Sequence, residues 1–292
     1  MSAAAWIRAA RLPAQSNIAL PLFVGEALAC PGGVGLSWAT ALLVGAFGLF
    51  DQLYIVFAND VADVDTDRDN ATPTPFSGGS RVLVAGAIAP RSLLRAAIAC
   101  AAAAGVVSLA LAARTGATSL VGLWALAVAL LHAYSFRPLR LSYRGGGEAL
   151  QLLGTGLVLP LYGFVAQKGA LLSFPWAALA WIAPMRLACA IATALPDEPS
   201  DRRAAKRTLV VALGARATAG ALALLQIVSL AAAARAFPVD LRPALAVPAS
   251  AALVGLALAG AAPGSRAMVA RVGALVFATL SLEAIGVWGQ LR

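Results

Sequence analysis

The sequence predicts an all-α integral membrane protein with about nine transmembrane helices, and three observations lead to this fold class. The chain is 61% hydrophobic and only 12% charged, whereas a soluble domain carries about 25% charged residues. Apolar runs of the length that spans a bilayer recur from one end of the chain to the other. Lysine and arginine are concentrated in alternate connecting segments, as expected for a multi-pass protein.

The apolar runs divide the chain into nine predicted membrane helices within one domain, residues 1–292. They cover 12–30, 36–58, 91–113, 117–135, 148–167, 174–195, 208–236, 243–262 and 267–289. The first run is the least regular, because Pro13, Pro21 and Gly25 interrupt it.

The basic residues predict the orientation of these helices. One side holds sixteen, namely Arg8, Arg11, Arg68, Arg81, Arg91, Arg95, Arg137, Arg140, Arg144, Arg202, Arg203, Lys206, Arg207, Arg216, Arg266 and Arg271. The other side holds five, namely Arg114, Lys168, Arg235, Arg242 and Arg292. The positive-inside rule then places the N-terminus and the long polar loops on the cytoplasmic face of the inner (cytoplasmic) membrane. The net charge of +9 is therefore interpreted as a topology signal and an attraction for anionic ligands, not as a nucleic-acid surface.

An acidic stretch, Asn59 to Asp67, follows the second run. On a continuous helix, Asp60, Asp63 and Asp67 share one face within about 60°, while Asp65 and Asp69 lie on the opposite face. Carboxylates at the end of a membrane helix are costly unless a cation binds them. Three carboxylates on one face suit the binding of Mg²⁺ and a phosphorylated ligand.

A second acidic stretch, Asp197 to Asp201, ends the sixth run on the same predicted membrane face. One such stretch alone would be interpreted as a solvated helix cap, but two on one face favour a site that binds cations and a diphosphate. Lys206, Arg207 and Arg81 are expected to contact the remaining phosphate oxygens. A catalytic site is therefore expected at the cytoplasmic end of the bundle.

These motifs resemble those of the UbiA-type intramembrane prenyltransferase superfamily. Asn59, Asp60, Asp63 and Asp67 fit its N-D-x-x-D-x-x-x-D motif, and Asp197 and Asp201 fit its second, D-x-x-x-D, motif. Further stretches are most similar to the menaquinone-pathway branch, which prenylates 1,4-dihydroxy-2-naphthoate: 74–83, 134–148 and 206–209. The chain departs from the pattern of this family at Thr193, Glu198, Pro199 and Arg137. Pro199 is expected to break or kink its helix.

The resemblance implies a central cavity and Mg²⁺-dependent transfer of a polyprenyl group from a polyprenyl diphosphate to an aromatic acceptor, with release of diphosphate. The five motif aspartates, Asp60, Asp63, Asp67, Asp197 and Asp201, would be catalytic and bind Mg²⁺, and Asn59 would contact the diphosphate. Tyr134 and Arg137 are further candidates for diphosphate binding. Two alternatives stay open: a terpene cyclase of the same superfamily that needs no aromatic acceptor, and a membrane transporter with acidic gates.

Several polar residues within the helices are candidates for the walls of the cavity. Gln52 and Val56 lie within about 80° of the carboxylate stripe on the second helix, so they are candidates for an acceptor pocket. Arg186, about 16 Å along its helix from Asp197, is a candidate for binding an acceptor carboxylate or for pairing with Glu26, Asp51 or Glu283. Asp51 points away from Asp60, so it is expected to be a partner for another helix.

Overall fold

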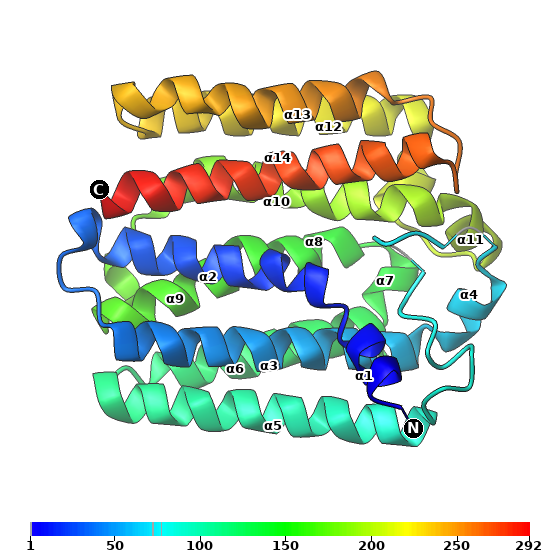
Figure 1. The fold of residues 1–292 in the computed structure, drawn as a ribbon, viewed down its shortest axis with the longest axis horizontal. Coiled ribbons are helices and arrows are strands. Elements are labelled where there is room, and N and C mark those ends of the chain that lie inside the picture. The colour runs from blue at the N-terminus through cyan, green and yellow to red at the C-terminus, as the bar shows by residue number, and fades with distance from the viewer. Residues whose placement is uncertain (1, 72, 77) are drawn as a thin grey trace.

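The computed structural model describes residues 2–71, 73–76 and 78–292, and every regular element in that part of the chain is a helix (Figure 1). The α-helices are α1 (Ala3–Ala10), α2 (Ser16–Ala29), α3 (Trp38–Ala62), α4 (Val64–Asp69), α5 (Pro90–Thr115), α6 (Ser119–Ser135), α7 (Leu141–Arg144), α8 (Gly147–Leu153), α9 (Leu159–Lys168), α10 (Leu179–Ala194), α11 (Glu198–Arg203), α12 (Leu209–Ala236), α13 (Ala246–Ala257) and α14 (Arg266–Leu291). A π-helical turn, Gly154–Val158, joins α8 to α9.

Seven helical segments of the described chain are long and apolar enough to cross a membrane, so the protein is a multi-pass integral membrane protein. They are Trp38–Ala62, Pro90–Thr115, Gly147–Lys168, Trp176–Arg203, Leu209–Ala236, Val239–Ala257 and Arg266–Leu291. Each corresponds to one of the predicted runs.

The other two predicted runs form shorter helices. Of these, α2 has 14 residues and α6 has 17, while a helix perpendicular to the bilayer needs about 20. Both helices nevertheless pack inside the bundle, α2 against α9 and α3, and α6 against α5. Gly25 permits the first contact, because a Cβ there would lie 2.0 Å from the carbonyl oxygen of Pro160 on α9. This glycine therefore marks a close helix crossing instead of an interruption.

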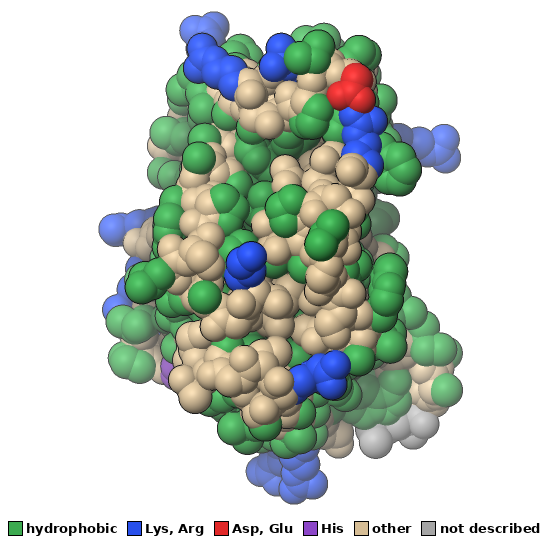
Figure 2. All heavy atoms as spheres, turned by 90° about the vertical axis from the view of Figure 1, so that its left-hand side faces the viewer, with side chains coloured by type: hydrophobic (Ala, Val, Ile, Leu, Met, Phe, Trp, Pro, Cys, Tyr) green, Lys and Arg blue, Asp and Glu red, His purple; other side chains and the backbone are tan. Residues whose placement is uncertain are grey.

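The long helices lie side by side, and the short helices α1, α4, α7 and α11 gather at one end of the bundle (Figure 1). The C-terminus lies at the opposite end. Figure 2 shows that opposite end, where scattered Lys and Arg side chains stand among hydrophobic and neutral groups with little acidic surface. The two acidic motifs thus lie at the same end of the molecule.

Two breaks in long helices position the acidic motifs. Helix α3 ends at Ala62, and Asp63 caps it with a non-helical backbone before α4 begins. Likewise, α10 gives way to a 3-10 turn at Leu195–Asp197 before α11. The break predicted at Pro199 is present, but it begins four residues earlier, at Leu195. A proline ring disturbs the carbonyl four residues before it, and Pro199 itself fits the first turn of α11.

Candidate functional site

A polar cavity of about 200 Å³ lies between the two acidic motifs, and we call it the acidic cavity. Its charged lining residues are Arg11, Asp63, Asp67, Glu148, Asp197, Asp201 and Lys206. Asp60 lies behind this wall and is only 3% exposed. Asp65 and Asp69 are exposed, as their helical spacing predicts. The spacing therefore separates the inward from the outward carboxylates, even though the helix breaks at Asp63.

Asp60 is held by the loop that follows the first motif. The backbone N–H of Ser80 lies 3.2 Å from Asp60 Oδ2, and the Ser80 hydroxyl donates to the same oxygen. Arg11, which follows α1, lies 3.8 Å from Asp60 Oδ1. The first carboxylate of the motif is thus already paired within the chain, and it anchors the loop and the N-terminal segment.

Gly79 brings the backbone of this loop close to the carboxylates. A Cβ at Gly79 would lie 2.0 Å from Asp67 Oδ2 and 3.2 Å from Asp60 Oδ1, and its φ of +65° also favours glycine. Ser77, which belongs to the same stretch, lies outside the described residues. The close approach explains why a glycine stands at this point of the loop.

Asp63 and Asp67 face the acidic cavity from the first motif. Asp63 Oδ1 accepts a hydrogen bond from the Tyr143 hydroxyl over 2.8 Å. Burial, together with the neighbouring charges of Asp63 and Asp60, raises the pKa of Asp67 to about 7. A cation close to this carboxyl group would favour its charged form and so lower its pKa.

Lys206 joins the two motifs. Its Nζ lies 3.6 Å from Asp63 Oδ2 and 3.5 Å from Asp201 Oδ1. Burial acts to lower the pKa of Lys206, but the carboxylates of Asp63 and Asp201 outweigh it, so the pKa is raised. The ammonium group also lies 4.4 Å from the centroid of the Tyr143 ring. A positive charge therefore stands between the motifs.

The second motif is tied to the first by another contact. The side-chain amide of Asn70 donates to Asp197 Oδ1 over 2.8 Å. Within the described residues, no group of three or more His, Cys, Asp or Glu side chains is arranged as a ready metal site. The cavity nevertheless presents carboxylate and amide oxygens from both motifs, and these are the donors that suit Mg²⁺. These oxygen atoms fit the predicted Mg²⁺, and Lys206 lies between the two acidic motifs.

The other predicted diphosphate-binding residues divide into three groups. Asn59 and Tyr134 line the acidic cavity, and the Tyr134 hydroxyl accepts a hydrogen bond from Gln151 over 2.9 Å. Arg81 instead donates from Nη1 to the backbone carbonyls of Asp67 and Asn70, so it holds the loop. Arg137 and Arg207 are exposed and do not line the acidic cavity.

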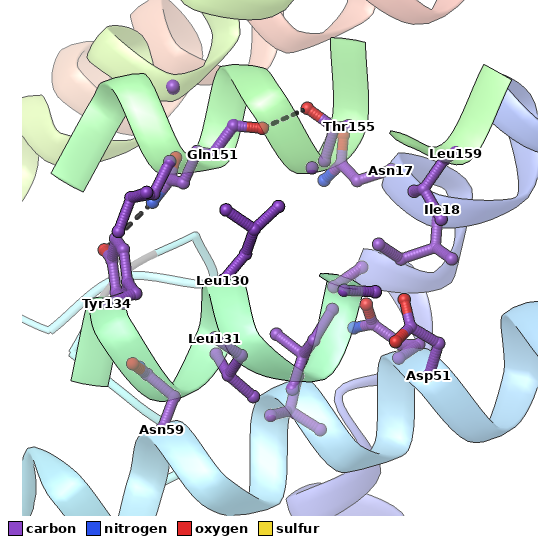
Figure 3. Close-up of a pocket in the computed structure, with 18 of the residues that line it drawn as sticks. Asn17, Ile18, Asp51, Asn59, Leu130, Leu131, Tyr134, Gln151, Thr155 and Leu159 are labelled. Carbon is purple, nitrogen blue, oxygen red and sulfur yellow. Dashed lines mark hydrogen bonds between the residues drawn. The ribbon is translucent and has the colours of Figure 1, made fainter. Parts of the chain in front are cut away.

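A second, largely apolar cavity of about 270 Å³ adjoins the acidic one, and we call it the apolar cavity. Arg11, Asn59, Phe76, Tyr134, Gln151, Ala190 and Thr193 line both. Figure 3 shows its interior, with Leu130 and Leu131 between Tyr134 at one end and Asp51 at the other. Gln52 and Val56 line it, as the helical spacing predicts. The π-helical turn contributes Gly154, Thr155 and Val158 to its wall.

Arg186 also borders the apolar cavity, but its donors are occupied. Nε lies 2.6 Å from Glu283 Oε1, and Nη2 donates to Glu283 Oε2. Nη1 donates to the carbonyl oxygen of Asn17 over 3.2 Å. Of the partners predicted for this arginine, Glu283 is the one it binds.

Sequence reasoning missed four residues that shape the acidic cavity: Arg11, Asn70, Ser80 and Tyr143. Ser80 and Tyr143 belong to the polar segments 74–83 and 134–148, which resemble the family, so these segments carry a signal that could have identified them. Arg11 and Asn70 carry no local signal, because their roles depend on contacts with Asp60 and Asp197 from other parts of the chain.

The fold and the two joined cavities define a helical membrane protein with an acidic site opening into an apolar chamber. Residues 18–281 match the UbiA prenyltransferase family. The chain belongs to this family, and it is accordingly a prenyltransferase enzyme.

One named relative supports this assignment, and two solved structures show the same fold. The chain is 31% identical over 218 residues to the 1,4-dihydroxy-2-naphthoate octaprenyltransferase of Mycobacterium tuberculosis, over 73% of this chain and 71% of the relative. A UbiA homologue from Archaeoglobus fulgidus, solved with GPP and Mg²⁺, superposes with a TM-score of 0.72 at 18% identity, over 98% of this chain and 99% of that one. The apo UbiA homologue from Aeropyrum pernix K1 gives 0.68 at 19% identity, over 91% and 96%.

Proposed function

We propose that this enzyme transfers a polyprenyl group from a polyprenyl diphosphate to an aromatic acceptor, 1,4-dihydroxy-2-naphthoate or a related quinone precursor, and releases diphosphate. The observation that supports this most is the position of Lys206 between Asp63 and Asp201 in the acidic cavity, which adjoins the apolar one. An anionic head group would bind in the acidic cavity through cations, and its hydrocarbon tail would enter the apolar one. The naphthoate prenyltransferase relative supports the choice of acceptor.

We assign Mg²⁺ to the carboxylates of Asp63, Asp67, Asp197 and Asp201, with Asp60 supporting them from behind. Mg²⁺ would neutralise the charge that gathers on the departing diphosphate. Lys206 and Arg11 are the chain's own cations in the acidic cavity, and they would bind phosphate oxygens directly. Asn59 and Tyr134 stand where the two cavities meet, and there they would orient the diphosphate above the apolar chamber.

The reaction follows from this division of the site. The allylic carbon–oxygen bond breaks, and its electron pair leaves with the diphosphate. The apolar walls, including Leu130 and Leu131, keep water from the electron-poor carbon. A carbon of the aromatic ring forms the new carbon–carbon bond, and the ring then loses a proton, or its carboxylate as carbon dioxide.

We further propose that α2 and α6 complete nine crossings in one domain over residues 1–292. Arg11, just before α2, contacts Asp60 at the acidic end, and Gly32, just after it, lies near Arg292 at the other. Ser135, at the end of α6, contacts Asn59 at the acidic end. With the sixteen basic residues counted on that side of the chain, we place the acidic cavity on the cytoplasmic side of the inner membrane.

The proposal is tested with the purified full chain in lipid nanodiscs. Geranylgeranyl diphosphate, 1,4-dihydroxy-2-naphthoate and Mg²⁺ are supplied together, and the products are identified by mass spectrometry. The expected result is a prenylated naphthalene product and one diphosphate per transfer. A cyclic or open-chain hydrocarbon that forms equally well without the naphthoate would replace this proposal with a terpene cyclase.

A further inference from the structure

The end of the apolar cavity farthest from the acidic motifs carries a buried carboxyl group, that of Asp51. The side chain lines the cavity, although the residue is only 3% exposed. Figure 3 shows Asp51 on α3 on the side of the chamber where Asn17 lies, with Asn59 and Tyr134 at the other end. Nine residues separate Asp51 from Asp60, about 13 Å along the helix, so Asp51 is too far away to belong to the acidic cavity.

Asp51 differs from the other buried carboxylates of the described chain, because it has no hydrogen-bond or ion-pair partner there. The others are all engaged: Glu26 by Gln167, Asp60 by Ser80, Asp63 by Tyr143, Glu148 by the backbone of Leu209, Asp201 by Lys206 and Glu283 by Arg186. A carboxyl group buried in a membrane helix without a partner is strongly unfavourable. The sequence-based expectation that Asp51 pairs with another helix is therefore not met within the described residues.

The two arginines in the wall of the apolar cavity bind other carboxylates. Arg186 forms its bidentate contact with Glu283, and Arg11 lies against Asp60. Asn17, Gln52 and Thr155 add polar groups to the same cavity, whereas Leu130 and Leu131 make its middle apolar. A ligand that fits this chamber would be apolar in its middle and would present a hydrogen-bond donor to Asp51.

We propose that Asp51 accepts a hydrogen bond from a hydroxyl group of the aromatic acceptor and thereby selects hydroxylated rings. This inference rests on the proposed function and assigns one of its specificity-determining residues. A prenyl tail at this position would leave the carboxyl group unpaired, while a ring hydroxyl satisfies it. The acceptor ring then lies between Asp51 and the diphosphate, which is the position it needs to attack the allylic carbon.

The test measures binding by isothermal titration calorimetry with the full chain in nanodiscs, in the presence of Mg²⁺ and diphosphate. The two probes are 1,4-dihydroxy-2-naphthoate and 1-hydroxy-2-naphthoate, which lacks one hydroxyl group. Wild-type protein is expected to bind the dihydroxy compound at least about tenfold more tightly, since a hydrogen bond to a charged group is lost in the other probe. Asp51→Leu should bind both probes about equally, and Asp51→Asn should keep part of the preference.

The matched control is Glu26→Gln, which changes another buried carboxyl group outside both cavities while preserving its contact with Gln167. It should keep the wild-type preference. Binding of geranylgeranyl diphosphate with Mg²⁺ checks that each variant is folded. An unchanged preference in both Asp51 variants overturns the role of Asp51 and leaves the proposed function standing. If wild-type protein binds neither naphthoate, both proposals fail together.

Discussion

The ammonium nitrogen of Lys206 lies 3.6 Å from Oδ2 of Asp63, so a cation that follows the second acidic stretch is bound to the first motif. This contact brings together the residue that caps α3 and the loop after α11. It also means that a charge already bridges the place where a cation-bound diphosphate would enter. Under the proposed function, substrate binding would redirect Lys206 toward phosphate oxygens.

Replacing Lys206 with Met should lower kcat/KM for the prenyl diphosphate by about 10- to 100-fold, because a charge-assisted hydrogen bond to phosphate is lost. Steady-state kinetics at saturating acceptor measures this. Arg68→Met is the matched control, because Arg68 is exposed and pairs with Asp65 on the surface. Equal values of kcat/KM in Lys206→Met and Arg68→Met would exclude Lys206 from diphosphate binding.

Asp63→Asn and Asp197→Asn should each reduce Mg²⁺-dependent turnover by at least about 100-fold, since both carboxylates belong to the proposed cation site. Asp65→Asn should behave like wild type, because that side chain is 88% exposed and lies outside the acidic cavity. Chelation with EDTA should abolish wild-type turnover, and added Mg²⁺ should restore it. Full turnover in EDTA would contradict a divalent cation requirement.

The affinity for Mg²⁺ should depend on pH through Asp67, whose pKa is raised to about 7 by burial and by its acidic neighbours. Below that pH the carboxyl group holds a proton that the cation must displace. Apparent affinity should therefore rise by about fivefold from pH 6 to 7 and by about tenfold from pH 6 to 8, and level off above. Calorimetric titrations across this range measure the trend. Asp67→Asn should flatten it, and an unchanged slope in that variant would assign the proton to another group.

Gly79→Ala should disturb the acidic cavity more than Gly86→Ala does. Both glycines have positive φ, +65° and +63°, so alanine costs each about 1–2 kcal/mol in backbone strain. Only at Gly79 would the added Cβ meet Asp67 and Asp60. Thermal unfolding should show a similar loss for both, while Mg²⁺ and diphosphate affinity should fall in Gly79→Ala alone. Equal affinities would mean that the loop moves away from the carboxylates freely.

Arg186→Met should destabilise the bundle by about 3–5 kcal/mol, because it leaves Glu283 buried without its partner. The double variant Arg186→Met with Glu283→Met should recover most of that loss. Chemical unfolding in detergent measures both. Acceptor affinity in the double variant answers a separate question. If this affinity equals that of wild type, Arg186 serves only to stabilise the bundle. A large drop in affinity would support the predicted contact between Arg186 and an acceptor carboxylate.

The acidic motifs and the spans were predictable from local pattern alone. The length of the hydrophobic runs predicts the seven long helices. A spacing of three or four residues places Asp63 and Asp67 on the side of the acidic cavity and Asp65 on the surface. The same spacing correctly assigned Gln52 and Val56 to the wall of the apolar cavity. These features depend on residues within one helix, so the sequence contains them directly.

The contacts between distant segments were decided only by tertiary structure. Arg81, Arg137 and Lys206 are all basic residues of polar loops, yet Lys206 alone of the three lines the acidic cavity. Charge attracts a long side chain to a region, but the packing of the backbone determines what its end group can reach. For the same reason, the sequence by itself determined a membrane enzyme with two acidic motifs, whereas the isolation of Asp51 at the far end of the cavity follows from how the helices pack.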